Sequence, residues 1–298
     1  MGVYVNKSSA GFKAARKSEY VDKSRMIAIT NQLLDSKQSL MCVSRPRRFG
    51  KSMAVEMLCA YYCEAYDSSP LFNDLQIASD DSYQEYLNKF PVIYIDITEF
   101  LTDGTPHKDI VKHLQQSVIE DLNETFGECY DKNEPLMKVL RKYVVKTGKK
   151  LIFLIDEWDA LCREYEGEAD LMEEYVELLR SLFKSSSTPE VFSLVYMTGI
   201  LPIIKYNTQS ALNNFDEYSM VAPGALAPYI GLTNDEVNAL CEKHGMPISD
   251  MKNWYDGYRL QDVGSIYNSN SVMTALRHRK CTGYWTKTAA YDSVSSYI

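Results

Sequence analysis

Two pairs of adjacent residues in this sequence are of the types that bind phosphate groups and a divalent cation. Lys51 and Ser52 end the stretch SRPRRFGKS, and Asp156 and Glu157 stand together 105 residues further on, from position 51 to position 156. The stretch matches the last part of the phosphate-binding P-loop pattern G-x-x-x-x-G-K-[ST], but Arg45 occupies the place of the first glycine. The sequence therefore raises the hypothesis of a nucleotide site, and the alternative is a basic loop that contains GKS by chance.

Each residue of the first motif has a defined task if the loop binds a nucleotide. Successive main-chain N–H groups of a P-loop surround the phosphates, and the next helix points its positive end at them. We expect Gly50 to permit close approach, Lys51 to bridge the β and γ phosphates, and Ser52 to hold Mg²⁺. Pro46 has no N–H, so the cradle must come mainly from Arg48 to Ser52. The predicted nucleotide-binding residues are Arg45, Pro46, Arg47, Arg48, Phe49, Gly50, Lys51 and Ser52.

The second motif has the form of a Walker B element, an apolar strand that ends in a carboxylate. The run LIFLI leads into Asp156, which we expect to coordinate Mg²⁺ through water, opposite Ser52. Glu157 is then placed to orient or deprotonate the attacking water. The alternative is an acidic helix N-terminus, where Asp and Glu are favoured anyway. Thr198 ends another apolar run, and we predict a sensor role toward the γ phosphate or the water, although threonine before glycine is also common in turns. The predicted catalytic residues are Lys51, Glu157 and Thr198, and the predicted metal ligands are Ser52 and Asp156.

The elements around these motifs alternate between apolar runs of strand length and segments with helical period. This alternation predicts an α/β fold with a parallel sheet flanked by helices, and right-handed crossovers between its strands. The predicted strands are 40–44, 92–97, 151–155 and 191–198, and the predicted helices are 24–36, 53–66, 108–126, 134–146 and 171–184. Thus the order strand, tight loop, helix, which a P-loop requires, is present around GKS.

The character of the sequence changes after about residue 225. A helix is predicted in LTNDEVNALCEKHG, with Thr233 as its N-cap and Gly245 at its end. The stretch NWYDGYRLQDVGSIYNSNSV that follows is rich in Tyr, Gly and Asn and has no strong period. We therefore predict a P-loop NTPase core at 1–225 and a smaller helical and irregular lid or appendage at 226–298.

Charge is distributed unevenly along the chain. Residues 1–60 contain 11 Lys or Arg against 4 Asp or Glu, and the remainder contains 21 against 36. An acidic bulk argues against extensive nucleic-acid binding, because contact with a phosphate backbone needs a positive face. The basic segment surrounds the GKS motif, which suits a small polyanion such as a nucleotide. Its three arginines, Arg45, Arg47 and Arg48, could steer that anion or face a partner.

Several other classes of function find no support in the residues. The seven cysteines form no C-x-x-C pair and the four histidines form no ligand cluster, which argues against zinc. No G-x-S-x-G motif for a serine hydrolase is present. No apolar run has the length of a signal peptide core or of the roughly 18 residues that a membrane span needs. We therefore expect a cytoplasmic protein without a membrane partner.

Seven segments together resemble the hallmark segments of the bacterial AAA-ATPase-like family. In order they are EYVDKS, SRPRRFGKS, FPVIYIDIT, LIFLIDEWDAL, MTGILPI, WYDGYR and IYNSNSV. The resemblance covers nearly the whole chain, from about residue 11 to the end. The family itself has R-P-R-R-F-G-K at the loop, so Arg45 departs from the general Walker A pattern and not from the family.

The resemblance implies an additional-strand P-loop ATPase fold. It implies that Lys51 and Ser52 bind ATP and Mg²⁺, and that Asp156 and Glu157 form the Walker B pair. Many members continue into a nuclease-like domain of the PD-(D/E)xK kind, but nothing after residue 226 offers an E-x-K preceded by a suitable Asp. We therefore expect no nuclease activity in these 298 residues, and a further C-terminal domain in the full-length protein stays open.

The first functional hypothesis is a Mg²⁺-dependent ATPase, a hydrolase that couples loss of the γ phosphate to movement of the appendage or a partner. The alternative is a nucleotide-gated switch or scaffold that scarcely hydrolyses ATP and contacts a protein or nucleic acid. A small-metabolite kinase is a third and weaker interpretation, because no basic lid segment is visible. In a homo-oligomer, Arg163 and Arg180 could act as arginine fingers on a neighbouring subunit, but surface ion pairs are the expected fate of both.

Overall fold

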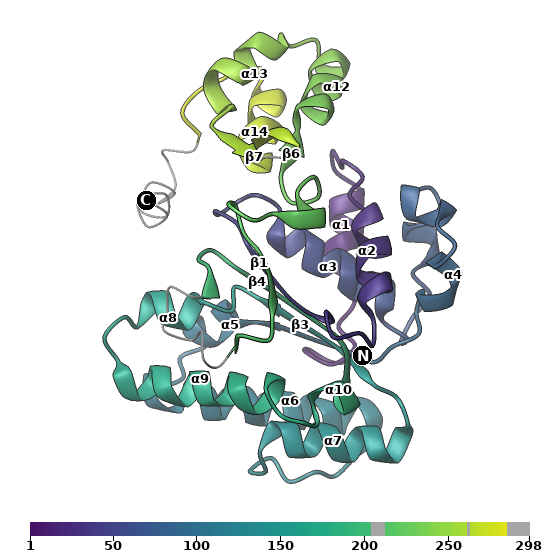
Figure 1. Ribbon diagram of the computed structural model, residues 1–298, viewed down its shortest axis with the longest axis vertical. Coiled ribbons are helices and arrows are strands. Elements are labelled where there is room, and N and C mark those ends of the chain that lie inside the picture. The colour runs from purple at the N-terminus through teal and green to yellow at the C-terminus, as the bar shows by residue number, and fades with distance from the viewer. Residues whose placement is uncertain (204–211, 261–262, 285–298) are drawn as a thin grey trace.

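The computed structural model describes residues 1–203, 212–260 and 263–284. A parallel five-stranded sheet with the order β2-β3-β4-β1-β5 lies at its centre (Figure 1). β4 lies between β1, which leads into the GKS loop, and β3, which ends at Asp156. The predicted additional-strand α/β fold is confirmed. The strands are β1 (Leu40–Ser44), β2 (Val92–Asp96), β3 (Leu151–Asp156), β4 (Phe192–Gly199) and β5 (Asp216–Tyr218).

Helices cover both faces of this sheet, and alternate strand residues point to the two helical layers. Cys42, Ile93 and Phe153 pack with one layer, whereas Met41, Tyr94 and Leu154 pack with the other. Because both faces are buried, the strands are apolar along nearly their whole length. Figure 1 shows α3 on one side of the sheet and α6, α7 and α9 on the other. The layers are formed by α2 (Arg25–Leu33) and α3 (Lys51–Tyr62), and by α6 (Ile110–Phe126), α7 (Leu136–Thr147) and α9 (Ala169–Phe183).

Shorter elements connect these layers. The short α-helices of the core are α1 (Ala10–Arg16), α4 (Tyr83–Tyr86), α5 (Ile97–Thr102), α8 (Ala160–Glu164) and α10 (Thr188–Val191), and the 3-10 turns are at Ser69–Leu71, Gln76–Ser79, His107–Asp109 and Gly224–Leu226. The helix after the GKS loop ends at Tyr62 and not at 66 as expected, because Cys63 is extended and forms a parallel bridge with Phe90. β5 was not predicted, because its three residues are polar or only partly buried and carry no apolar signal.

The C-terminal unit contains helices and a small antiparallel sheet with the order β6-β8-β7. The prediction of an irregular segment was therefore wrong here, because strands of two to four residues are too short to show alternation. Thr233 does form a capping box with Glu236, and Gly245 ends that helix with φ 65°, as expected. The elements are β6 (Leu232–Thr233), α12 (Asn234–His244), α13 (Ile248–Tyr255), β7 (Tyr258–Leu260), β8 (Gly264–Tyr267) and α14 (Ser269–His278).

Packing places the start of this C-terminal unit near Leu232. Leu232 belongs to a separate apolar cluster with residues of α12, α13 and α14, whereas Leu226 and Ile230 pack in the main core. The predicted division at 225/226 stays a prediction. The last residues of the predicted appendage, 285–298, lie outside the described ranges. Within those ranges, no helix combines the length and the apolar character that crossing a bilayer requires.

The amino-terminal segment is fastened to the core by one buried carboxylate. Asp121 of α6 accepts hydrogen bonds from the N–H groups of Val3 (3.0 Å), Tyr4 (2.7 Å) and Val5 (2.7 Å). Val5 in turn forms an antiparallel bridge with Ile93 of the edge strand β2. A carboxylate that receives three N–H groups is a charge-assisted arrangement, which makes each bond stronger than a neutral one.

We expect Asp121→Ala to lower the free energy of unfolding by about 3 kcal/mol, because three N–H groups, of which that of Val5 is buried, lose a charged acceptor. Urea unfolding followed by circular dichroism measures the change. The matched control is Glu124→Ala, an exposed acid on the same helix, which should change stability by less than about 0.5 kcal/mol. Equal stability of the two variants would contradict the fastening role.

Candidate functional site

The GKS loop joins β1 to α3 and bends sharply at two positions. Arg48 has φ 70° and Gly50 has φ 92°, both in the left-handed region. Gly50 is also the N-cap of α3, so glycine relieves the strain that a side chain would create there. Left-handed residues within such a loop turn successive N–H groups to one side, which creates an anion-binding concavity. The loop therefore has the backbone form that its sequence predicts.

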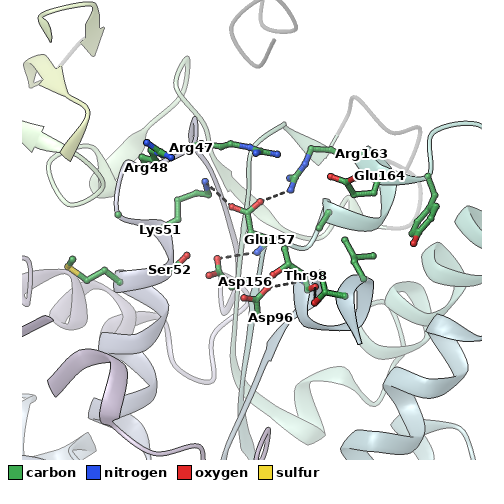
Figure 2. A pocket seen from close by; sticks show the side chains of 16 residues that line it. Arg47, Arg48, Lys51, Ser52, Asp96, Thr98, Asp156, Glu157, Arg163 and Glu164 are labelled. Carbon is green, nitrogen blue, oxygen red and sulfur yellow. Dashed lines mark hydrogen bonds and ion pairs between the residues drawn. The ribbon is translucent and has the colours of Figure 1, made fainter. Parts of the chain in front are cut away.

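A cavity of about 740 Å³ lies in front of this loop and collects the charged residues of both motifs (Figure 2). The parallel register places Asp96 of β2 directly beside Asp156 of β3. Asp96 accepts hydrogen bonds from the N–H (2.9 Å) and hydroxyl (2.7 Å) of Thr98, so it caps α5, as its position at an edge strand suggests. The charged residues that line the cavity are Arg47, Arg48, Lys51, Asp96, Asp156, Glu157, Arg163 and Glu164.

Asp156 is held by the end of β4 and by the residue that follows it. Thr198 of β4 donates a hydrogen bond to its carboxylate, and the N–H of Glu157 donates a second over 3.1 Å. Burial raises the pKa of Asp156, since desolvation disfavours its charge, and the hydroxyl groups of Ser52 and Thr198 oppose that effect. The arrangement brings the two predicted metal ligands, Ser52 and Asp156, together.

Glu157 lies between two cations. Its Oε1 is 3.4 Å from Lys51 Nζ and its Oε2 is 2.7 Å from Arg163 Nη2 (Figure 2). Burial acts to raise the pKa of Glu157, but the charges of Lys51 and Arg163 outweigh it, and the net effect lowers the pKa. The φ of Glu157 is 52°, a conformation that few residues other than glycine adopt. An ionised carboxylate is therefore presented to the cavity next to the predicted metal ligands.

Arg163 belongs to this cavity, although its sequence position suggested a surface ion pair or a finger on another subunit. It stands on α8 and pairs with Glu157 and with Asp159, and its side chain is only 15% exposed. The sequence does contain a signal for this position. Arg163 comes four residues after Asp159, which is the spacing of an ion pair along a helix, and this helix begins just after β3. Arg180, by contrast, forms an exposed pair with Glu177, as expected.

The residues after Asp156 also fix the end of β4. Asp159 accepts hydrogen bonds from the N–H groups of Ile200 (3.0 Å) and Leu201 (3.1 Å). The N–H of Trp158 donates to the carbonyl of Thr198 over 2.8 Å. Thr198 itself is fully buried and its hydroxyl is directed at Asp156, so it does not line the cavity. The structure thus supports a positioning role for Thr198, and its predicted contact with a phosphate or water stays a prediction.

Arg45 is not among the residues that line the cavity, and its predicted contact with a nucleotide stays a prediction. Its N–H donates to the carbonyl of Gly199 (3.1 Å), and its guanidinium donates to the carbonyls of Ser44 (3.0 Å) and Tyr218 (2.8 Å). The side chain therefore leaves the loop toward β5 and is completely buried. An arginine can stand in place of the first glycine because its side chain joins two strands and leaves the phosphate side open.

The other loop residues divide between the cavity and the core. Arg47 and Arg48 line the cavity with Gly50, Lys51 and Ser52, and the predicted nucleotide binding by these residues stays a prediction. The carbonyl of Pro46 accepts a hydrogen bond from Lys51 Nζ over 3.4 Å. The ring of Phe49 is buried against Tyr258 of the C-terminal unit, with 5.2 Å between ring centroids, so its side chain is structural.

The fold is that of P-loop NTPases of the AAA type, with the additional strand β4 between the two motif-bearing strands. Residues 11–208 match the family model described as "Predicted AAA-ATPase". The chain therefore belongs to the AAA-ATPase-like family.

A curated protein of Azotobacter chroococcum mcd 1, described as "Uncharacterized protein in vnfD 5'region", is 25% identical over 257 residues. The match covers 83% of this chain and 46% of that protein, so the chain spans about half of the relative's length. Among solved structures, replication initiator DnaA bound to AMPPCP and single-stranded DNA is 9% identical, with a TM-score of 0.44 and coverage of 91% of this chain and 66% of that one. The Aeropyrum pernix ORC2 protein (ADPNP-ADP complexes) is 10% identical, with a TM-score of 0.47 and coverage of 95% and 72%.

We expect Asp159→Ala to lower the free energy of unfolding by about 3 kcal/mol, because Arg163 loses a buried partner and two N–H groups at the end of β4 lose their acceptor. Arg163→Ala should cost less, and the double variant should be less destabilised than the sum by about 1 kcal/mol, since the residues contact each other. Urea unfolding of the wild type, the two single variants and the double variant completes a double-mutant cycle. Glu166→Ala, an exposed acid after α8, is the control. Strict additivity would show that the pair is not energetically coupled.

Proposed function

We propose that this protein binds ATP and hydrolyses it with Mg²⁺, and that the reaction is coupled to movement of its C-terminal unit or of a partner. One observation carries the proposal: Lys51, Ser52, Asp156 and Glu157 meet at one cavity, although the two pairs are far apart in sequence. Such a combination of a cation, a hydroxyl, a buried carboxylate and an ionised carboxylate is what phosphoryl transfer to water needs. Membership of the AAA-ATPase-like family supports the same class of reaction.

The residues present suit a magnesium ion. The side chains of Ser52 and Asp156 offer only oxygen atoms, and both residues line the same cavity. Mg²⁺ prefers oxygen ligands and is commonly held by one or two carboxylates together with phosphate oxygens and water. The bound ion would supply charge neutralisation at the phosphates. Ser52 and Asp156 are the residues that would hold it.

Lys51 and the loop arginines would bind the phosphates. Lys51 is paired with Glu157 over 3.4 Å, a long contact that a phosphate group can replace. Transfer of Lys51 to the phosphates leaves the Glu157 carboxylate with Arg163 alone, so one oxygen becomes available to orient a water molecule. Arg47 and Arg48 add positive charge at the same cavity. When a nucleotide binds, Lys51 would thus exchange its ion pair with Glu157 for a contact with the phosphates.

The base of the nucleotide would enter a second, mostly apolar cavity. Gly50 and Met53 line both cavities, which supports this assignment. Its other walls come from Tyr20 and Val21 of the amino-terminal segment and from the C-terminal unit, including Leu232. Apolar and aromatic side chains are the usual surroundings of a bound planar ring. The choice of ATP over GTP rests on the family.

A nucleotide-gated switch that scarcely hydrolyses ATP is the second candidate. The observation that favours it is the engagement of both Glu157 oxygens by Lys51 and Arg163, since a carboxylate held by two cations is a weaker base for water. Nucleotide binding without turnover distinguishes this function from an ATPase.

We expect the wild type to turn over ATP when Mg²⁺ is present. Glu157→Gln should keep nucleotide affinity within about threefold and lose at least about 100-fold in turnover, because an amide cannot accept the proton of water. Lys51→Ala should weaken binding by at least about tenfold, since a charged phosphate contact is lost. Phosphate release and calorimetry with Mg²⁺-ADP measure the two effects.

Matched controls for these variants come from exposed residues outside the cavity, Glu166→Gln and Lys37→Ala, which should behave as the wild type. Equal turnover in the wild type, Lys51→Ala and Glu157→Gln would overturn the ATPase proposal. Tight binding in the wild type without phosphate release would favour the switch.

A further inference from the structure

Three consecutive carbonyl groups of the phosphate-binding loop accept hydrogen bonds from three consecutive residues of the C-terminal unit. The side-chain amide of Asn268 donates to the carbonyl of Arg47 over 3.0 Å. The hydroxyl of Ser269 donates to the carbonyl of Phe49, and the N–H of Asn270 to that of Arg48, each over 3.3 Å. We call these three bonds the 268–270 contact.

The 268–270 contact acts on the part of the loop whose shape matters for anion binding. Arg47, Arg48 and Phe49 directly precede Gly50, and Arg48 is itself held at φ 70°. A peptide unit has its carbonyl and its N–H on opposite sides, so donors that hold the carbonyls on one side keep the N–H groups turned to the other. Three donors on the outer side of the loop therefore stabilise the concave form.

The donors themselves belong to a rigid element. Asn268 is the N-cap of α14, and its side-chain oxygen accepts the N–H of Ser271 over 3.1 Å while its amide nitrogen reaches the loop. The N–H of Asn270 lies in the first turn of α14, where N–H groups lack partners within the helix. The loop carbonyl of Arg48 supplies one of those missing acceptors. The first turn of α14 and the loop thus supply each other with hydrogen-bond partners.

A separate contact holds the C-terminal unit in place. Lys23 of the amino-terminal segment is half-buried and donates to the carbonyl of Pro228 (2.7 Å) and to both Glu236 oxygens (2.6 and 2.5 Å). Glu19 pairs with Lys243 at 2.7 Å on the same side of the unit. Removal of one bond at Asn268 should therefore release the loop without detaching the unit.

We propose that Asn268 and Ser269 are positioning residues for the phosphate-binding loop, and that through them the seating of the C-terminal unit sets nucleotide affinity. The inference rests on the proposed nucleotide-binding function. It assigns to Asn268 and Ser269 of the IYNSNSV segment a role at the loop backbone, and Ser269 also lines the second cavity. By thermodynamic reciprocity, a bound nucleotide must also stabilise the contact of α14 with the loop.

The test uses Asn268→Ser, which separates two tasks of one residue. Serine keeps an N-cap oxygen for α14 but is too short to reach the carbonyl of Arg47. Calorimetry with Mg²⁺-ADP should show affinity about fivefold weaker in Asn268→Ser and about twentyfold weaker when Ser269→Ala is added, as expected for one and two lost hydrogen bonds. The matched controls are Asn253→Ser and Ser249→Ala, the same exchanges at exposed positions of α13.

A purely structural role of Asn268 predicts a different result, a lower melting temperature with unchanged affinity. The double variant, folded and with affinity within twofold of the wild type, would overturn the inference. Absence of Mg²⁺-ADP binding in the wild type would instead overturn the proposed function on which it rests. If the double variant does not fold, hydrogen exchange of the wild type decides: the amide of Asn270 should exchange more slowly with Mg²⁺-ADP bound, and unchanged exchange would contradict the coupling.

Discussion

The buried carboxylate of Asp156 is the constraint on which the arrangement of the site depends. It receives hydrogen bonds from the end of β4 and from the residue that follows it, and Ser52 in the first turn of α3 lines the same cavity. A carboxylate with so little access to water needs these partners, because an unpaired buried charge is costly. The three motif-bearing segments must therefore meet at one edge of the sheet. The register of β1, β4 and β3, which places Val43 beside Thr198 and Ile155 beside Met197, satisfies that requirement.

The sequence allowed the sheet and the core of the site to be predicted because their signals are local. Strands buried on both faces are continuous apolar runs, and the residues at their ends, such as Asp156, follow directly from those runs. The order of β4 between β1 and β3 followed from the family and is confirmed. Strand β5 and the small C-terminal sheet lacked such signals, because they have two to four residues each and depend on distant neighbours for their pairing.

Arginine was the residue type that sequence reasoning placed least well. Its long side chain can reach far from its own backbone, and the direction is decided by acceptors that tertiary structure brings close. Arg45 leaves the loop to join Tyr218, which is 173 residues away, and Arg163 turns inward to a carboxylate on the strand before its own helix. Their charge and their positions in the sequence indicated a possible functional role for both arginines. Only the positions of their acceptors showed which one stabilises the sheet and which one belongs to the cavity.

The contact between α14 and the phosphate-binding loop uses main-chain carbonyls of the loop and none of its side chains. The C-terminal unit therefore responds to the path of the backbone and is indifferent to the identity of residues 47 and 48. Their side chains remain available at the mouth of the cavity. Substitution there leaves the hydrogen bonds between the loop and the C-terminal unit in place, because only main-chain atoms of the loop form them. The lining of the cavity and the contact with α14 thus use different atoms of the same two residues.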